Sequence, residues 1–309
     1  MDYGISVRRC AWLVPMAGEA AETLLAPPEP SEPIAAGSRR REVAAASARS
    51  LLLTVLGEFV HTRGVPVWTG VLVDALGLLG VEEKSARQAL ARTTGDGLLE
   101  PSRHGRRAQW SLTPLGTRIL EEGTERIYGF MRSRRGWDGR WLVLTVAIPE
   151  TQRKLRHRLR TRLTWAGLGS PAPGLWVVPD ADKETEIASV IADLGVSAHA
   201  YAWVGPRATF SDEQRLVSEA WCLRDVESRY YDFIGTFSDT MPVDGPDAFV
   251  QQVRLIQEWR RFPFLDPALP AELLDHEWPG AAAADTFHRQ HDAWNAAAQE
   301  HWESLSAGR

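Results

Sequence analysis

The spacing of apolar residues predicts four helices and a hairpin between residues 47 and 128. Helical periodicity runs through residues 47–64, and a short extended piece, "VPVW", follows it. The next helix is expected at 69–80, with Thr69 as a plausible N-cap, and a third starts in the stretch from Ser85 and stops at Gly95-Asp96-Gly97. Two extended runs joined at His104-Gly105-Arg106 predict a hairpin, and Thr113-Pro114 marks the start of a fourth helix. This order is typical of a winged helix-turn-helix.

The pattern changes after residue 136. Residues 137–205 alternate as β-α-β-β-α-β, the order of a ferredoxin-like fold, and residues 207–305 read as helices. Ser211 and Gln214 form a capping box at the start of one long expected helix that ends near Phe237. We therefore expect an α+β protein with a disordered leader (1–46), a winged-helix domain (47–130), a ferredoxin-like middle domain (137–205) and a helical C-terminal domain (207–305).

The third predicted helix divides its residues between two faces. Ala86, Ala89, Leu90 and Thr93 follow helical spacing and are expected to face the core. The opposite face and the hairpin tip carry donors that suit a duplex, because Arg and Gln can form paired hydrogen bonds with base edges. The candidate DNA-binding residues are Lys84, Ser85, Arg87, Gln88 and Arg92 on the helix, and Arg103, His104, Arg106 and Arg107 on the hairpin. The alternatives are a solvated surface helix or a module that binds a protein.

Charge and composition narrow the class of protein. The chain has 309 residues and a formal net charge of −5, which excludes a uniformly basic nucleic-acid coat but leaves room for a local basic face. Its two cysteines, Cys10 and Cys222, exclude a disulfide scaffold and favour the cytoplasm. No apolar run reaches the length of a membrane helix, so we expect no membrane partner.

The helix expected at 151–165 holds the densest group of cations in the chain. Arg153, Lys154, Arg156, Arg158, Arg160 and Arg162 surround a stripe of leucines. This surface could contact DNA phosphates, an acidic partner subunit or the phosphates of a nucleotide-bearing effector. An ordinary solvated face explains the pattern equally well.

Motifs of catalysis are missing from the sequence. It contains no GxSxG elbow, P-loop or GxGxxG, so we expect no enzyme, no catalytic residues and no resident cofactor. His288 and His291 are one helical turn apart, but this pair is a weak metal motif and favours exposed polar residues, so no metal is expected. The alternative function is a metal-dependent nuclease in the middle domain, in which Asp138 would be the essential carboxylate.

Several strings resemble the PaaX family of transcriptional repressors of phenylacetic acid catabolism. They are "ARSLLLTVLGEFV", "SARQALARTTGDGLL", "WDGRWLVLTVAIPE", "LGSPAPGLWVVP" and "EWRRFPFLDPALPAELLDHEWPG". The resemblance covers roughly residues 47–300 and implies a homodimer that binds double-stranded DNA at a partly palindromic operator. It also implies release from DNA by phenylacetyl-CoA or another acyl-CoA. The DNA-reading helix of the family falls on 83–94 and its wing on 98–112.

The resemblance also suggests where an effector would bind. A CoA thioester needs cations for its phosphates and an apolar slot for its aryl group. By residue type and family position, the candidates are Trp137, Arg140, Arg153, Trp259, Arg260 and Phe262. The alternative for each tryptophan is a place in a core or an interface. Two features depart from the family pattern: the leader, and Glu82 at the position where a Ser or Asp cap of the DNA-reading helix would be better.

Overall fold

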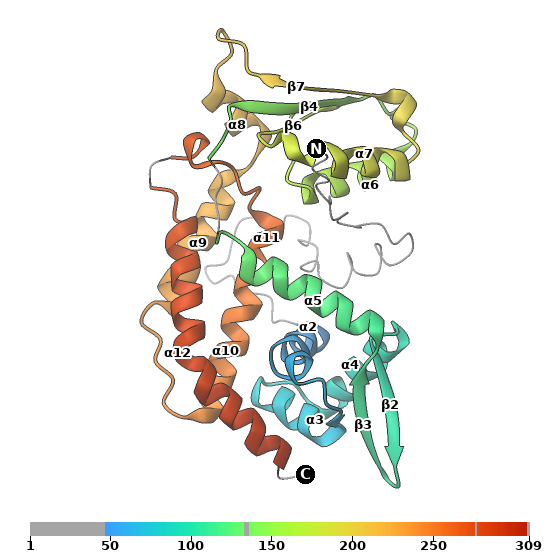
Figure 1. Ribbon diagram of the computed structural model, residues 1–309, viewed down its shortest axis with the longest axis vertical. Helices are drawn as coiled ribbons and strands as arrows, with labels where there is room; N and C mark the ends of the chain where they lie inside the picture. The colour runs from blue at the N-terminus through green and yellow to red at the C-terminus, as the bar shows by residue number, and fades with distance from the viewer. Residues whose placement is uncertain (1–46, 133–135, 276, 308–309) are drawn as a thin grey trace, which may run out of the picture.

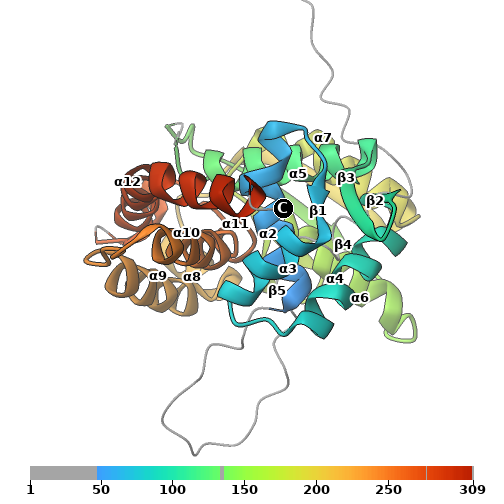
Figure 2. The ribbon, with the colours of Figure 1, turned by 90° about the horizontal axis from the view of Figure 1, so that it is seen from below.

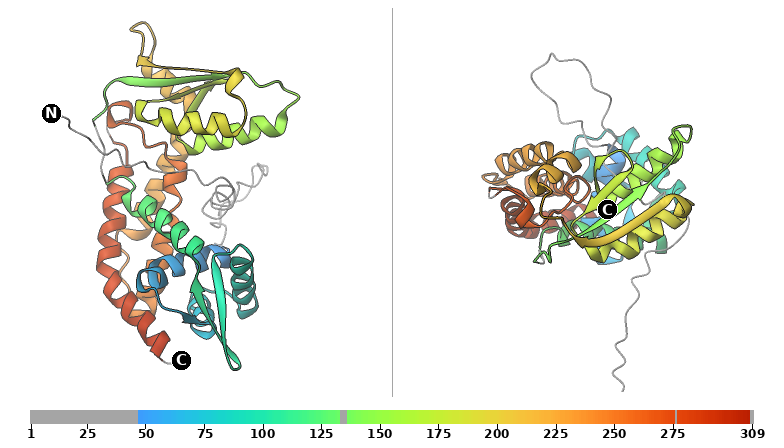
Figure 3. Two further views of the ribbon diagram at one scale, coloured as in Figure 1. Left: turned by 45° about the vertical axis from the view of Figure 1, so that its right-hand side comes forward. Right: turned by 90° about the horizontal axis from the view of Figure 1, so that it is seen from above.

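The computed structural model describes residues 47–132, 136–275 and 277–307 and shows an elongated α+β protein (Figure 1). A helical unit with a small sheet lies at one end, and a larger sheet covered by helices lies at the other. The C-terminal helices run along one side and join the two ends (Figures 1 and 3). Within the described residues, no helix is both long and apolar enough to cross a membrane. The predicted leader, 1–46, lies outside the described residues.

The first unit has its elements in the order that the sequence predicts. Helix α2 continues through a π turn and a 3-10 turn, and a three-stranded antiparallel sheet forms in the order β1-β3-β2. The elements are α2 (Ala48–Val55), the π turn η1 (Leu56–Val60), the 3-10 turn η2 (His61–Arg63), β1 (Val67–Trp68), α3 (Thr69–Leu78), α4 (Glu83–Gly95), β2 (Leu99–His104), β3 (Arg107–Leu112) and α5 (Pro114–Gly129).

Two side chains fix the ends of helices in this unit, one as expected and one differently. Thr113 caps α5 by accepting a hydrogen bond from the backbone N–H of Gly116 at 3.0 Å, as predicted. A Cβ atom at Gly116 would lie 2.2 Å from the carbonyl oxygen of Leu98, so only glycine fits where α5 meets the hairpin. The N-cap predicted at Thr69 is wrong, because Thr69 is already the first residue of α3. Its hydroxyl instead accepts from Trp110 Nε1 at 2.8 Å and ties α3 to β3.

The middle part of the chain folds as strand, helix, two strands, helix and strand. Its sheet is antiparallel throughout, in the order β5-β6-β4-β7, and helices α6 and α7 cover one face (Figure 1). The opposite face packs in part against α8. The elements are β4 (Arg140–Val146), α6 (Arg153–Trp165), β5 (Gly169–Ala172), β6 (Leu175–Val178), α7 (Glu184–Asp193) and β7 (Ala200–Pro206), with α8 (Glu213–Ala220) after them.

The C-terminal part is helical, as expected, but its first helix is divided. The capping box predicted at Ser211 and Gln214 is wrong, since Asp212 caps α8 through the N–H of Arg215 at 3.1 Å. The chain leaves the helix at Trp221, whose indole N–H donates to the Gly167 carbonyl at 3.2 Å. The remaining helices are α9 (Leu223–Phe237), α10 (Gly245–Trp259), the short α11 (Phe262–Leu265) and α12 (Gly280–Ala307).

One hydrophobic core joins the first unit to the C-terminal helices. Phe59 packs against both Phe249 of α10 and Trp302 of α12, with ring centres 4.9 and 5.5 Å away. All three are at least 98% buried, and the same cluster includes Leu52, Leu72 and Leu90. The first unit therefore packs as one body with α10 and α12, although the sequence places them far apart. The domain boundaries drawn from the sequence stay a prediction.

Candidate nucleic-acid interface

Helix α4 has one buried and one exposed face, and the division falls where the sequence predicts it. Ala86, Ala89, Leu90 and Thr93 are buried against the first unit. The Thr93 hydroxyl, which is polar, donates to the carbonyl of Ala89 at 2.8 Å. The exposed face carries Lys84, Arg87, Gln88 and Arg92, with Ser85 half-buried beside them. The small buried alanines let α4 approach its neighbours closely and direct the longer side chains to solvent.

A charged residue stands at each end of α4, and only the one at the C-terminal end has a partner there. Arg49 of α2 forms an ion pair with Asp96, directly after the last turn. Glu82 occupies the N-cap and makes no side-chain cap, which is the weak start that the sequence suggested. On the exposed face, Arg87 lies 2.8 Å from Glu83 one turn earlier. This pair is open to solvent and is worth under about 1 kcal/mol, so Arg87 can leave it at small cost to reach another acceptor.

Strands β2 and β3 form a basic hairpin with a two-residue turn. His104 pairs with Arg107, and Gly105 between them adopts a φ of +63°, a backbone conformation that favours glycine. The side chains of Arg103, His104, Arg106 and Arg107 are all exposed at its tip. Figure 1 shows this hairpin projecting beside α4 at the lower end of the molecule.

Trp68 supports the basic hairpin, and sequence reasoning did not identify it. Its ring lies 4.7 Å from the guanidinium carbon of Arg107 and 5.7 Å from the centre of the His104 ring. Cation–π contacts of this kind are worth about 0.5–1 kcal/mol at exposed sites. Thr69, the next residue, forms hydrogen bonds with Ala108 and Trp110 of β3. These contacts of Trp68 and Thr69 fix the hairpin relative to α3. The feature of the sequence that could have indicated this role is a tryptophan in the short extended piece before a helix.

Family profiles match three consecutive stretches of the chain. The profile of a PaaX-like protein matches residues 47–116, that of the PaaX protein central Cas2-like domain matches 134–217, and that of the PaaX-like protein C-terminal domain matches 221–304. The transcriptional repressor PaaX of Escherichia coli (strain K12) is 31% identical over 248 residues, which are 77% of this chain and 77% of that repressor. The chain belongs to the PaaX family. The identification made from the quoted strings is thus confirmed.

A solved structure has a similar fold. The uncharacterized protein Rv0674 from Mycobacterium tuberculosis superposes with a TM-score of 0.58 at 24% identity, over 83% of this chain and 99% of that one. At this level of identity the comparison shows the fold alone. It supports an architecture shared along most of the length of this PaaX-family chain.

The six candidate effector residues are distributed over different clusters of the structure. Trp137 packs on Trp141 at 5.6 Å beside β4, and Arg153 is exposed at the start of α6. Trp259 and Phe262 instead belong to the buried aromatic core of the C-terminal helices. The alternative for the tryptophans, a place in a core, therefore describes Trp259, which is fully buried. Arg140, the first residue of β4, donates to Asp138 at 2.6 Å. The last candidate, Arg260, lines a cavity between α2, α5 and α10.

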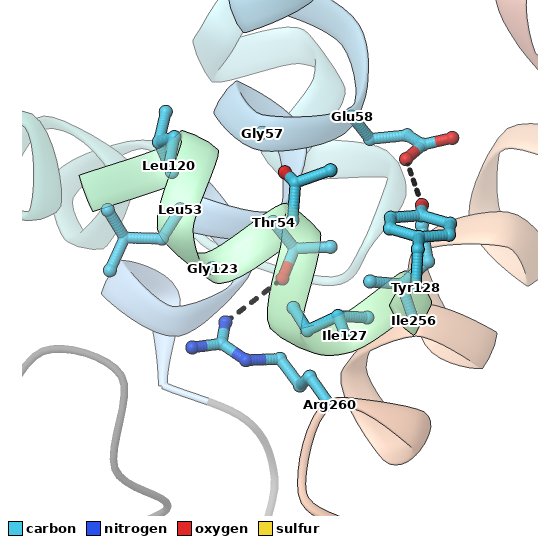
Figure 4. A pocket seen from close by; sticks show the side chains of 11 residues that line it. Leu53, Thr54, Gly57, Glu58, Leu120, Gly123, Ile127, Tyr128, Ile256 and Arg260 are labelled. Carbon is cyan, nitrogen blue, oxygen red and sulfur yellow. Dashed lines mark hydrogen bonds between the residues drawn. The ribbon is translucent and has the colours of Figure 1, made fainter. Parts of the chain in front are cut away.

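Arg260 is a buried cation at the junction of α2, α5 and α10 (Figure 4). Its Nη1 atom donates to the Thr54 hydroxyl at 3.2 Å, and burial lowers the pKa of its guanidinium to about 10. It lines a cavity of about 40 Å³ together with leucine and isoleucine side chains. A space of this size holds a few water molecules, because each needs roughly 10–15 Å³.

A buried carboxylate next to this cavity joins the first unit to the C-terminal helices. Glu58 accepts hydrogen bonds from Tyr128 of α5, Gln252 of α10 and His291 of α12, the last two at 2.9 and 2.8 Å. Burial alone would raise the pKa of Glu58. The pKa is nevertheless lowered, because His291 contributes a hydrogen bond and a charge, and Tyr128 and Gln252 each contribute a hydrogen bond. Burial alone would lower the pKa of His291, but the contact with Glu58 raises it. The exposed location expected for His291 is therefore wrong.

No described part of the chain gathers the ligands of a metal. In residues 47–132, 136–275 and 277–307, no group of three or more His, Cys, Asp or Glu side chains could hold an ion. Asp138, the carboxylate of the nuclease alternative, is exposed and bound by Arg140 through its backbone N–H at 2.9 Å and its side chain. The bonds from Arg140 lower the pKa of Asp138. The relatedness to a transcriptional repressor does not favour the nuclease alternative.

Proposed function

We propose that this protein is a sequence-specific DNA-binding transcriptional repressor, in which the first unit acts as a winged helix-turn-helix. The exposed face of α4 carries the proposal, because Arg87, Gln88 and Arg92 stand outward on a helix whose other face is fully packed. A helix of this kind fits the major groove of B-DNA, where Arg recognises guanine and Gln recognises adenine. The relative from Escherichia coli, a transcriptional repressor, supports the same role.

The basic hairpin would act as the wing. Arg103, Arg106 and Arg107 are exposed at the tip of the hairpin and would bind phosphates of the flanking backbone. Such contacts add affinity and salt dependence without reading sequence. The ion pair of Arg49 with Asp96 and the packing of Trp68 hold helix and wing in the fixed geometry that simultaneous binding requires.

The remaining elements of the proposal follow from the family. The middle part would be a ferredoxin-like domain, which its strand order β5-β6-β4-β7 and the two helices on one face support. The protein would bind a partly palindromic operator as a homodimer in the cytoplasm and repress an aromatic-acid operon of the phenylacetate type. An aryl-acyl-CoA such as phenylacetyl-CoA would release it. The shared core of α2, α10 and α12 offers a direct mechanical connection between the C-terminal helices and the first unit.

Selection of bound fragments from the genome of the host tests the proposal. The full chain should recover specific fragments, with steep salt dependence in titration. Arg87→Ala should relax base preference at one position by about 1–3 kcal/mol, whereas Arg106→Ala should weaken binding to all sequences alike. The proposal would be contradicted if the chain recovered no specific fragment, or if Arg87→Ala and Arg106→Ala changed base preference and overall affinity in the same way. Addition of phenylacetyl-CoA, with free CoA as control, tests the effector by thermal shift.

A further inference from the structure

Helix α6 carries a cationic surface that is separate from α4 and the basic hairpin, the elements proposed above to bind DNA. Its leucines face the core of the middle part, and the cations lie on the remaining surface. Arg156 and Arg162 have acidic partners, Glu150 at 3.7 Å and Asp193 at 3.0 Å. Four further cations are exposed and take part in no ion pair with any described residue: Arg153, Lys154, Arg158 and Arg160. We call these four side chains the α6 cations.

The arrangement of the α6 cations opposes the stability of the helix itself. Arg153 and Lys154 stand in the first turn, where the helix dipole favours negative charge, and the first turn contains no acidic residue. Lys154 and Arg158 are four residues apart, a spacing at which like charges repel. From Thr151 to Gly167 the sequence has no Asp or Glu that would relieve this repulsion. A chain with a net charge of −5 therefore concentrates cations where folding alone disfavours them, which points to a polyanionic ligand.

Helix α6, which carries the α6 cations, lies on the same side of the molecule as the proposed DNA-reading helix (Figures 1 and 2). Along the long axis, α6 stands above α4 in Figure 1, and the view from below in Figure 2 places both at the same edge. Helices α9, α10 and α12 lie at the opposite edge. A duplex that sits on α4 and continues along this side would bring its backbone toward α6.

We propose that α6 binds the sugar–phosphate backbone of the duplex that flanks the site read by α4. This inference rests on the proposed function and extends it by a second contact surface in the middle part of the chain. Guanidinium and ammonium groups pair with phosphate oxygens without regard to base sequence, so α6 lengthens the bound duplex and adds no base preference. Each phosphate contact also releases counterions, which makes the contribution of α6 measurable as salt dependence.

The test compares two lengths of the fragment recovered by genomic selection. The short duplex is trimmed to the smallest length that keeps base preference, and the long one is extended on both sides. The variant Arg153→Gln, Lys154→Gln, Arg158→Gln, Arg160→Gln should bind the short duplex as the wild type does. It should lose the extra affinity that the wild type gains on the long duplex. On the long duplex, the slope of the logarithm of the binding constant against the logarithm of the salt concentration should be smaller in this variant, by about 0.9 for each lost phosphate contact and by up to about 3.6 for all four.

A matched variant separates position from net charge. Arg224→Gln, Arg229→Gln, Arg254→Gln, Arg289→Gln removes four exposed arginines from α9, α10 and α12, at the opposite edge. This control should bind both duplexes like the wild type. If the fourfold glutamine variant unfolds at lower temperature, the two half-variants carry the test: Arg153→Gln, Lys154→Gln and Arg158→Gln, Arg160→Gln should each lower the slope on the long duplex by up to about 1.8.

Four results would overturn the inference. An unchanged slope in the α6 glutamine variant, or an equal loss in the opposite-edge control, would show that α6 does not bind flanking DNA while leaving the proposed function intact. Normal DNA binding with a lost response to an acyl-CoA would assign the α6 cations to an effector. Failure of the wild type to retain any duplex would instead overturn the proposed function, and with it this inference.

Discussion

Replacement of Glu58 by Gln tests whether the buried carboxylate connects the first unit to the C-terminal helices. The side chain of Glu58 is 10% exposed and that of His291 is 15% exposed, so solvent screens their contact only in part. Three donors on α5, α10 and α12 would pass from charge-assisted to neutral hydrogen bonds, a loss of about 1 kcal/mol each. Relief from burying a charge offsets part of this loss. We expect a destabilisation of about 2 kcal/mol, or about 4–8 °C in Tm.

The effect should depend on pH in a defined direction. The raised pKa of His291 means that its contribution is fully present below its ordinary value of 6.5 and is lost as the pH rises through the folded pKa. The lowered pKa of Glu58 means that its contribution is present above its ordinary value of 4.5 and is lost as the pH falls through the folded pKa. The pair therefore stabilises most between these two values, and the gap between wild type and variant should shrink at alkaline pH.

Urea unfolding followed by tryptophan fluorescence measures this gap. We would compare the free energy of unfolding at about pH 5.5 and about pH 8.5, which lie below and above the ordinary pKa of a histidine. Glu303→Gln is the matched control, because Glu303 pairs with Arg63 at 2.9 Å but is 61% exposed. The control should change stability by under about 1 kcal/mol at both pH values. Two results would refute the reasoning. One is a free energy of unfolding of Glu58→Gln that equals the wild-type value within error at pH 5.5, and the other is a difference between the two proteins that does not vary with pH.

Three further substitutions test local features. Gly116→Ala should destabilise by at least about 2 kcal/mol in thermal unfolding, because its Cβ would lie 2.2 Å from the Leu98 carbonyl; a Tm equal to the wild type would contradict this contact. Glu83→Gln should raise duplex affinity in titration without changing Tm, since it removes a carboxylate from the exposed face of α4 and frees Arg87. Reduced affinity would count against the placement of this face of α4 on the duplex. Arg260→Met should be neutral or raise Tm, because Arg260 is buried without a carboxylate in contact among the described residues, and a loss above about 3 kcal/mol would indicate an anion bound there.

The order of elements and the two faces of α4 could be predicted from the sequence because both depend on local periodicity. The stripe Ala86, Ala89, Leu90 and Thr93 is set by the 3.6-residue turn, and the turn at Gly105 is set by backbone geometry within four residues. These features need no knowledge of distant parts of the chain. The candidate DNA-binding side chains were identified for the same reason, and all except the half-buried Ser85 lie exposed.

Features made by distant residues could not be predicted in this way. The break at Trp221 depends on a bond to Gly167, and the role of Thr69 depends on Trp110 across the sheet. His291 resembled an exposed polar residue because its partner, Glu58, lies 233 positions earlier. The candidate effector residues were chosen by type, and type does not show that Trp259 is fully buried. Sequence periodicity tells which face of a helix is covered, but the partner that covers it must come from the fold.

The most direct test of the central claim is a single-base scan of the recovered fragment with the wild type and Gln88→Ala. Gln88 stands exposed on α4, and a glutamine in the major groove pairs with adenine. The account predicts that the variant loses about 1–3 kcal/mol of preference at one A·T pair and keeps the wild-type profile elsewhere. A variant profile identical to that of the wild type at every position would contradict the placement of α4 in the groove.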